Sequence, residues 1–316
     1  MRILGILSCL IGLVVGGFFA VANSSANAAD NIKIGLIEPL SGPIAAIGID
    51  AQQAFETAAE QINAKGGVLG GRMLEIVPLD NAMSAEKTTQ QLKNAVDLGL
   101  KYIIQGIGSN HALNIIKFVN KNNKRNPDKA IMFLNHSAVT TAFTNELCSF
   151  WHFRFDANVD QKVAGLVTQM SRDSSIKKVY MINQNYAYGK SFQGAAHAIM
   201  GERTPSIEIV GDELIVPFGK VQDFTPFIAK IKASGADTVL TGNWGPDLVR
   251  LIKFAAGANL PVQFYTIYGG LTSSVAAYGA DAAKISLKQV NEFHENHATL
   301  SADSVAFADA AVSAPG

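Results

Sequence analysis

The sequence predicts an α/β protein with two doubly wound, parallel-sheet lobes joined by an extended crossover. Three observations support this prediction. Short apolar runs alternate with segments in which apolar residues recur at helical spacing. These runs end in loops of Gly, Asn, Ser and Pro. The alternation occurs in two series, separated by the extended aromatic segment WHFRFDAN at 151–158. Such alternation implies parallel sheets with helices on their faces.

The first series opens with the apolar run at 34–37, which is too short for a helix and is closed by Glu38 and Pro39. A loop at 39–48 leads into a helical pattern, and Ser84 is placed to cap a second helix. The expected elements are strands at 34–37, 74–79, 102–104 and 131–134 and helices at 51–62, 84–98 and about 112–119.

The second series follows the aromatic segment and repeats the same alternation. Its expected elements are strands at 179–182, 207–216, 238–240 and 262–265 and helices at 163–170, 189–201, 224–231 and 248–256. A further strand is expected at 285–290, crossing back towards the first lobe. The stretch at 298–316 is small, polar and weakly patterned, so no element is predicted there.

Residues 1–29 form a candidate signal peptide. Arg2 precedes an apolar stretch at 3–22, and Ala26-Asn27-Ala28 is a small-residue cleavage signal before Asp30. The alternative is an uncleaved membrane anchor, because the apolar stretch is nearly long enough to span a bilayer. We favour cleavage, and therefore expect a soluble protein exported to the periplasm.

The composition excludes several classes of protein. Among 316 residues, 26 are basic and 26 acidic, and no basic stripe suited to nucleic acid is visible. Cys148 is the only cysteine outside the leader, which excludes an internal disulfide and a thiolate metal site; we expect it to be a half-buried structural residue. His294 and His297 are weak evidence for zinc. No cofactor, metal or nucleophile motif is expected, and we predict a protein that is not an enzyme.

Candidate ligand contacts gather where the predicted strands end, at the edge where open α/β sheets bind ligands. These loops are rich in Ser, Asn, Tyr and Trp and poor in charge, which suits a small polar or aromatic ligand. Ser109 stands before a helix whose N-terminus can bind a carboxylate. His136 is expected to be a neutral ligand contact or a spacer, with no carboxylate partner evident nearby. Tyr188 and Trp244 are expected to contact the ligand.

Several motifs resemble those of the leucine/isoleucine/valine-binding protein family, the type I periplasmic substrate-binding proteins of ABC importers. These motifs are PLSGPIAAIG, INAKGGVLGGRMLEIVPLD, IGSN, SAVTTAFTNELCS, NYAYG and NWGPDLVRLIKFA. The resemblance covers about 32–297. It implies two lobes joined by hinge crossings, capture of a ligand by hinge closure, and docking on membrane permease subunits. We expect a monomer.

The resemblance also implies roles for individual residues. Ser109 and Asn110 resemble the pair that holds the ligand's carboxylate, and Ala138 resembles a backbone contact to the same end, although the usual threonine falls on Val139. In addition, Tyr188 resembles the tyrosine that folds over the ligand, Trp244 an aromatic neighbour, and Ile47 the position of an aromatic gate.

Tyr268 departs from the family pattern. Amino-acid binders commonly carry an acidic residue near this position to pair with the ligand's ammonium group, and no Asp or Glu lies between Asp247 and Asp281. We therefore expect a ligand with a carboxylate or amide but no α-ammonium group, such as an aromatic acid. A leucine-like ligand is the alternative. Two other classes remain open, namely a ligand-sensing domain of the same fold and an exported α/β hydrolase.

The length also departs from the family, whose members continue for several dozen residues past the His294 region. We expect a truncated or frameshifted product in which the first lobe is incomplete. The expected organisation is a signal peptide at 1–29, a first lobe at 30–155, a second lobe at 156–284, and a return crossing with an incomplete C-terminal segment at 285–316.

Overall fold

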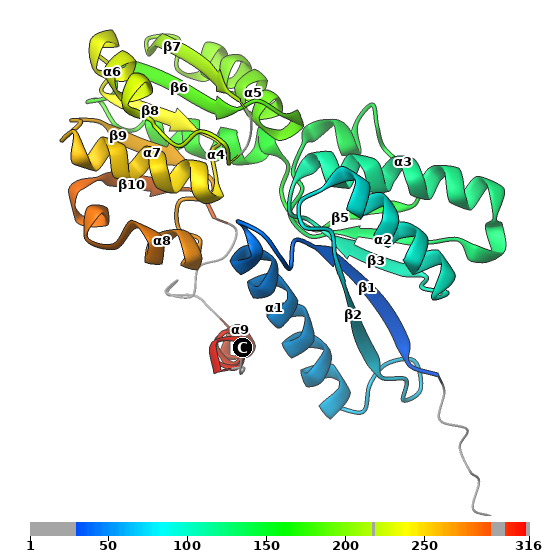
Figure 1. Cartoon of the computed structure of the whole chain (residues 1–316). Helices are drawn as coiled ribbons and strands as arrows, with labels where there is room; N and C mark the ends of the chain where they lie inside the picture. The colour runs from blue at the N-terminus through cyan, green and yellow to red at the C-terminus, as the bar shows by residue number, and fades with distance from the viewer. Residues whose placement is uncertain (1–29, 217–218, 292–300, 314–316) are drawn as a thin grey trace, which may run out of the picture.

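A computed structural model describes residues 30–216, 219–291 and 301–313 (Figure 1). The expected signal peptide lies outside these residues, as do the two histidines weighed as zinc ligands, His294 and His297. Among the described residues, no helix is both long and apolar enough to cross a membrane.

The first half of the described chain forms a five-stranded parallel sheet with the order β2-β1-β3-β4-β5. Its strands are β1 (Ile32–Glu38), β2 (Leu74–Asp80), β3 (Tyr102–Gln105), β4 (Met132–Asn135) and β5 (His152–Arg154). All five strands come from one unbroken stretch of sequence, and their carboxyl ends meet at one edge.

The second half repeats this arrangement. Its sheet has the order β10-β9-β8-β6-β7, so that its first strand in sequence again lies between the second and the third. The strands are β6 (Lys178–Gln184), β7 (Glu208–Ile215), β8 (Thr238–Thr241), β9 (Gln263–Thr266) and β10 (Ser286–Gln289), and all pair in parallel. The predicted α/β fold with two parallel sheets is confirmed.

Nine helices connect and cover these strands within the described ranges: α1 (Ala45–Ala64), α2 (Ala85–Asp97), α3 (Ser109–Arg125), α4 (Val159–Met170), α5 (Ala187–Arg203), α6 (Thr225–Ser234), α7 (Gly245–Gly257), α8 (Thr272–Tyr278) and α9 (Ala302–Ser313). Figure 1 shows α2 and α3 together and α1 apart from them. Ser84 caps α2 as predicted, accepting a hydrogen bond from the Lys87 amide at 3.3 Å.

The second sheet is buried on both faces, which explains its continuous apolar strands. Along β6, Val179 and Met181 point into a core shared with α4 and α5, whereas Tyr180 and Ile182 point into another core with α6 and α7. This alternation follows from the two-residue period of a strand.

Three segments differ from the sequence-based expectation. The aromatic segment expected to be only a crossover contains β5, an edge strand of the first sheet. Helix α1 begins at Ala45, before the apolar pattern starts, because Gly48 lets its first turn lie on Pro39; a Cβ there would be 2.2 Å from the Pro39 carbonyl oxygen. Helix α9 forms where no element was expected, and it contacts α1.

Cys148 is exposed, so the expectation of a half-buried structural cysteine is wrong. It lies in the turns between Thr144 and β5, outside both sheets, where no packed layer covers it. The apolar pattern of the surrounding sequence was too weak to predict this exposure.

Candidate functional site

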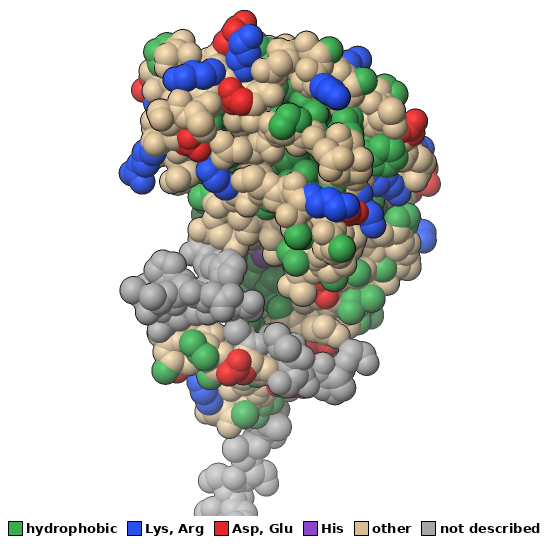
Figure 2. Space-filling model, turned by 90° about the vertical axis from the view of Figure 1, so that its left-hand side faces the viewer, with side chains coloured by type: hydrophobic (Ala, Val, Ile, Leu, Met, Phe, Trp, Pro, Cys, Tyr) green, Lys and Arg blue, Asp and Glu red, His purple; other side chains and the backbone are tan. Residues whose placement is uncertain are grey.

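A cleft of about 370 Å³ lies between the carboxyl-end loops of the two sheets. Figure 2 shows a hollow at the waist of the molecule, with hydrophobic side chains and a histidine inside it. The predicted residues that line the cleft are Ile47, Ser109, His136, Ala138, Tyr188, Trp244 and Tyr268. Asn110 is exposed and its side chain is not part of the lining.

The N-terminus of α3 opens onto the cleft at Ser109. Gly108 precedes it with a φ of 94°, a conformation that glycine adopts without strain. Ser109 is buried, and α3 has no acidic residue in its first turn. Within the described chain, the backbone N–H groups of Ser109 and Asn110 have no backbone acceptor. Free N–H groups and the helix dipole together make this end a site for an anion.

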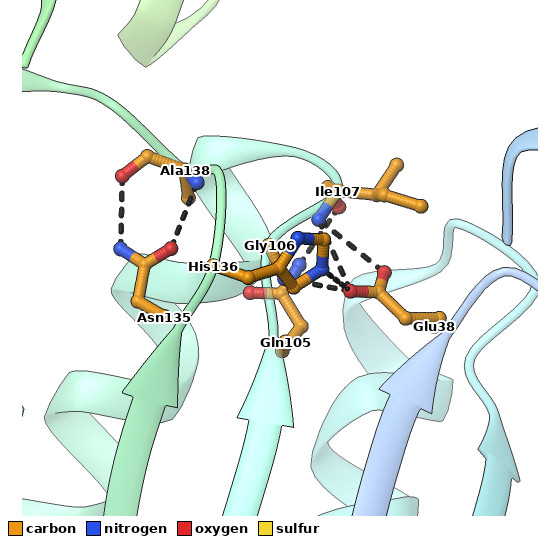
Figure 3. A network of polar contacts seen from close by, with 7 residues as sticks. All are labelled: Glu38, Gln105, Gly106, Ile107, Asn135, His136 and Ala138. Atoms are coloured by element: carbon orange, nitrogen blue, oxygen red, sulfur yellow. Dashed lines mark hydrogen bonds and ion pairs between the residues drawn. The ribbon is translucent and has the colours of Figure 1, made fainter. Parts of the chain in front are cut away.

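Glu38 lies next to this helix end, at the carboxyl end of β1, and its side chain is fully buried (Figure 3). Its Oε1 accepts a hydrogen bond from the Gly106 amide at 2.7 Å, and the Ile107 amide lies 3.3 Å from Oε2. The carboxylate therefore fixes the loop between β3 and α3. Sequence reasoning missed Glu38 as a site residue, although an acidic residue directly after a buried strand was the available signal.

His136 is the third partner of Glu38. Its Nε2 lies 2.6 Å from Glu38 Oε1, so the prediction that no carboxylate partner lies nearby is wrong. The two residues are 98 positions apart, and the strand order β1-β3-β4 brings their strand ends together. Phe55 of α1 contacts the imidazole edge to face, with ring centroids 5.3 Å apart. These contacts fix the ring at the cleft wall.

The loop that carries His136 is held by Asn135, which is fully buried. Asn135 Nδ2 donates to the Ala138 carbonyl and Asn135 Oδ1 accepts from the Ala138 amide, both at 2.8 Å (Figure 3). Its Nδ2 also lies 3.1 Å from His152 Nε2. Because the Ala138 amide is already used, Ala138 lines the cleft without a free backbone donor.

Gly106 makes room for the imidazole. A Cβ at Gly106 would lie 2.5 Å from Ser137 Oγ and 2.6 Å from His136 Nε2. Any other residue at this position would displace the side chains of Ser137 and His136.

Aromatic side chains of the second half form the opposite wall of the cleft. The Trp244 indole donates to Tyr186 Oη at 2.7 Å, and Tyr188 contacts both Tyr186 and Tyr268, with ring centroids 5.8 and 5.9 Å apart. Burial raises the pKa of Tyr186 and of Tyr188 well above the usual range, so both hydroxyls stay protonated. Tyr188 Oη is buried and has no hydrogen-bond partner among the described residues.

A buried ion pair supports this aromatic wall. Lys162 of α4 pairs with Asp156 at 2.9 Å, and its ammonium group lies 5.6 Å from the centre of the Tyr268 ring. On the other side, Asp247 accepts a hydrogen bond from Gln184 Nε2 at 3.0 Å, and the same amide donates to the Trp244 carbonyl at 3.2 Å. These contacts fix Trp244 at the start of α7.

Asp50 of α1 also lines the cleft, and sequence reasoning missed it. Partial burial raises the pKa of its carboxyl group. It belongs to α1, which begins earlier than its apolar pattern indicates, so the sequence did not place Asp50 on this wall. The acidic and basic side chains at the cleft are thus Asp50, His136 and its hydrogen-bond partner Glu38, and no Lys or Arg is among its described lining residues. Within the same described part, no cluster of three metal-binding side chains occurs.

The family profile described as "Periplasmic binding protein" matches residues 31–314. The chain is 34% identical, over 265 residues, to a Leu/Ile/Val-binding protein homolog 4 of Brucella abortus, and the match covers 83% of this chain and 62% of that protein. The chain therefore spans about 62% of the length of this curated relative.

Two solved structures are similar in fold. One is the closed conformation of a leucine-, isoleucine-, valine-, threonine- and alanine-binding protein from Brucella ovis, with a TM-score of 0.77, 33% identity, and coverage of 90% of this chain and 71% of the other. The second is a solute-binding protein of an ABC transporter from R. palustris in complex with benzoate, with a TM-score of 0.75, 23% identity, and coverage of 89% and 73%.

Proposed function

The chain belongs to the periplasmic binding protein family, and we propose on this basis that it is the extracytoplasmic solute-binding component of an ABC importer. Membership of a family of binding proteins confirms the prediction that the chain is not an enzyme, and it removes the hydrolase alternative. In this proposal the protein works as a monomer in the periplasm, closes on a small ligand, and delivers it to membrane permease subunits.

The observation that carries the proposal is the asymmetry of the cleft. One wall offers the N-terminus of α3 with the buried Ser109, which suits a carboxylate. The opposite wall is formed by Tyr188, Trp244 and Tyr268, which suit an apolar or aromatic body. A small carboxylic acid with a ring or a branched side chain matches both walls, because its carboxylate suits the helix N-terminus and its apolar body suits the aromatic side chains.

Our preferred ligand is an aromatic acid of the benzoate type. The aromatic wall presents Tyr268 where amino-acid binders would present a carboxylate. Two acidic groups lie behind this wall: Asp247 is fully buried behind Trp244, and Asp156 is paired with Lys162. An α-ammonium group would find no carboxylate among the described lining residues of this wall, whereas a ring would stack against it.

A branched-chain amino acid is the second candidate, favoured by Asp50. Its carboxylate lines the cleft from α1 and could pair with an ammonium group approaching from the first half. The names of two similar proteins point the same way: one is a leucine-, isoleucine-, valine-, threonine- and alanine-binding protein at 33% identity, and the other is a Leu/Ile/Val-binding protein homolog at 34% identity.

A thermal-shift series with benzoate, 4-hydroxybenzoate, benzamide, L-leucine and L-isoleucine tests both candidates. A ligand at one hundred times its dissociation constant adds about 2.7 kcal/mol of stability. Stabilisation by benzoate, lost in Tyr268→Glu, supports the aromatic acid. Stabilisation by leucine that is lost in Asp50→Asn supports the amino acid instead. No stabilisation by any of the five compounds would contradict the proposed ligand class.

A ligand-sensing domain would bind the same compounds without delivering them. Uptake of the radiolabelled ligand by cells that carry or lack the gene separates the two roles. Uptake that depends on the protein supports transport, and uptake that is unchanged by its loss supports sensing.

A further inference from the structure

We propose that Glu38 and His136 form a proton-linked anchor, in which binding of the ligand's carboxylate is coupled to uptake of one proton by His136. The inference rests on the proposed function, because it requires a carboxylate ligand in the cleft. It assigns to these two residues a role in specificity and in the pH dependence of binding.

The first step concerns the charge of Glu38. A buried carboxylate is stable only when it is paired and hydrogen-bonded. Glu38 is fully buried, and two backbone amides at Gly106 and Ile107 satisfy part of its acceptor capacity. Among the described residues the sole basic side chain paired with it is His136, at 2.6 Å. Glu38 accordingly holds a proton on His136 Nε2.

The second step concerns the other ring nitrogen. With Nε2 bound to Glu38, the group that His136 can offer to a ligand is Nδ1, and no described residue hydrogen-bonds to this atom. In the neutral ring Nδ1 is an acceptor and repels a carboxylate, whereas in the imidazolium form it is a donor. A carboxylate therefore selects the imidazolium form, which forms when Nδ1 takes one proton from water.

The third step concerns competing charges. The lining of the cleft has no Lys or Arg among the described residues, so the imidazolium and the N-terminus of α3 supply the positive potential for an anion. The other titratable groups on the cleft are Asp50 from α1 and Tyr186, Tyr188 and Tyr268 across it. Burial raises the pKa of Tyr186 and of Tyr188, so these two stay neutral. Asp50 is the other carboxyl group among the described lining residues that could take up a proton when an anion binds.

Isothermal titration calorimetry of benzoate and of L-leucine at pH 7.5, in buffers of different ionisation enthalpy, measures the number of protons taken up. We expect a net uptake of up to one proton in the wild-type protein, and an affinity that falls as the pH rises, by at most about tenfold per pH unit for one proton. His136→Gln keeps a donor for Glu38 but cannot be protonated, so it should abolish the uptake. Asp50→Asn should retain it.

Uptake of zero in the wild type, uptake that persists in His136→Gln, or uptake lost in Asp50→Asn would each overturn the proposal.

If neither compound binds, the ligand class of the proposed function fails, and the Glu38–His136 pair is tested without ligand. The His136 Cε1 proton resonance, assigned with His136→Gln, is followed against pH in the wild type and in Glu38→Gln. A midpoint at least about one pH unit lower in Glu38→Gln supports the pair, and an equal midpoint refutes it.

If Glu38→Gln does not fold, Glu38→Asp, which keeps the charge but shortens the side chain, takes its place in that titration. In Glu38→Asp the carboxylate lies farther from the His136 ring. The midpoint of the His136 resonance should therefore fall, but by less than removal of the negative charge would lower it. An unchanged midpoint again refutes the pair.

Discussion

The loop that carries His136 depends on one buried side chain, and its removal gives a sharp prediction. In Asn135→Ala, the amide and the carbonyl of Ala138 lose their hydrogen bonds, each of 2.8 Å. Ala138 is only 2% exposed, so water cannot replace the lost partner. Each unsatisfied buried group costs about 1–3 kcal/mol, so for the two groups we expect a loss of about 2–6 kcal/mol in the free energy of unfolding.

Urea unfolding followed by tryptophan fluorescence measures this loss. The chain has two tryptophans, Trp151 beside β5 and Trp244 in the second half. All measurements are made in a Trp244→Phe background, so that Trp151 reports on the first sheet. Asn145→Ala, which removes an exposed amide, is the matched control and should change stability by no more than about 0.5 kcal/mol.

A second variant separates the backbone bonds from the loss of volume. Asn135→Asp keeps the shape but replaces the donor amide by an oxygen that faces the Ala138 carbonyl, so it should cost at least as much as Asn135→Ala. A loss below about 1 kcal/mol for both variants would refute the reasoning, because it would mean that Asn135 does not hold the loop.

Three further predictions follow from the site and its surroundings. Gly106→Ala should weaken binding of the cleft's ligand at least about tenfold, measured by calorimetry, because the new Cβ would displace the His136 ring. Tyr188→Phe should leave the free protein as stable or more stable by up to about 1 kcal/mol in urea, because it removes a buried hydroxyl without a described partner. Burial lowers the pKa of His111 and of His152 from 6.5 to about 4. Below pH 6.5 the unfolded chain binds more protons, so stability should fall from pH 6.5 to pH 4 and lose about 2 kcal/mol per histidine between pH 7 and pH 5.

Each of these predictions has a control and a contradicting result. Gly194→Ala in α5 meets no atom within 4 Å and should bind the ligand like the wild type; equal binding by the Gly106 variant would contradict the packing argument. For Tyr188→Phe the control is Tyr102→Phe, which removes an exposed hydroxyl. A decrease of more than about 1 kcal/mol in the free energy of unfolding of Tyr188→Phe would mean that the Tyr188 hydroxyl has a hydrogen-bond partner. A flat stability profile between pH 7 and pH 5 would contradict the histidine argument.

The sequence predicts the regular elements well where the apolar pattern is strong. The strands from β1 to β4 and from β6 to β10 were expected within a few residues, because most of them are short apolar runs closed by Gly, Pro or polar residues. The strand expected at 285–290 is β10, which pairs with β9 in the second sheet. The prediction fails where the pattern is weak. β5 has only three residues, and α9 is built of small residues without an apolar stripe, so neither carries a periodic signal.

The site was predicted in part for a related reason. Strand-end loops can be read from the sequence, and most of the predicted residues line the cleft. The partner of a given side chain depends on strand order, which local pattern does not encode. Glu38 and His136 meet because β3 lies between β1 and β4, and the Ala138 amide is occupied because Asn135 folds back on its own loop.

The arrangement of the sheets also bears on the order in which the protein can fold during synthesis. Each sheet takes its described strands from one unbroken stretch, so the five described strands of the first sheet are outside the ribosome once Arg154 has left it, before any strand of the second has emerged. Domains fold as units, the N-terminal one first. Helix α1 is the exception, because its face that contacts α9 stays without this contact until α9 has been made. A ribosome-bound nascent chain should therefore form the described strands of its first sheet early and protect this face of α1 only after α9 has emerged.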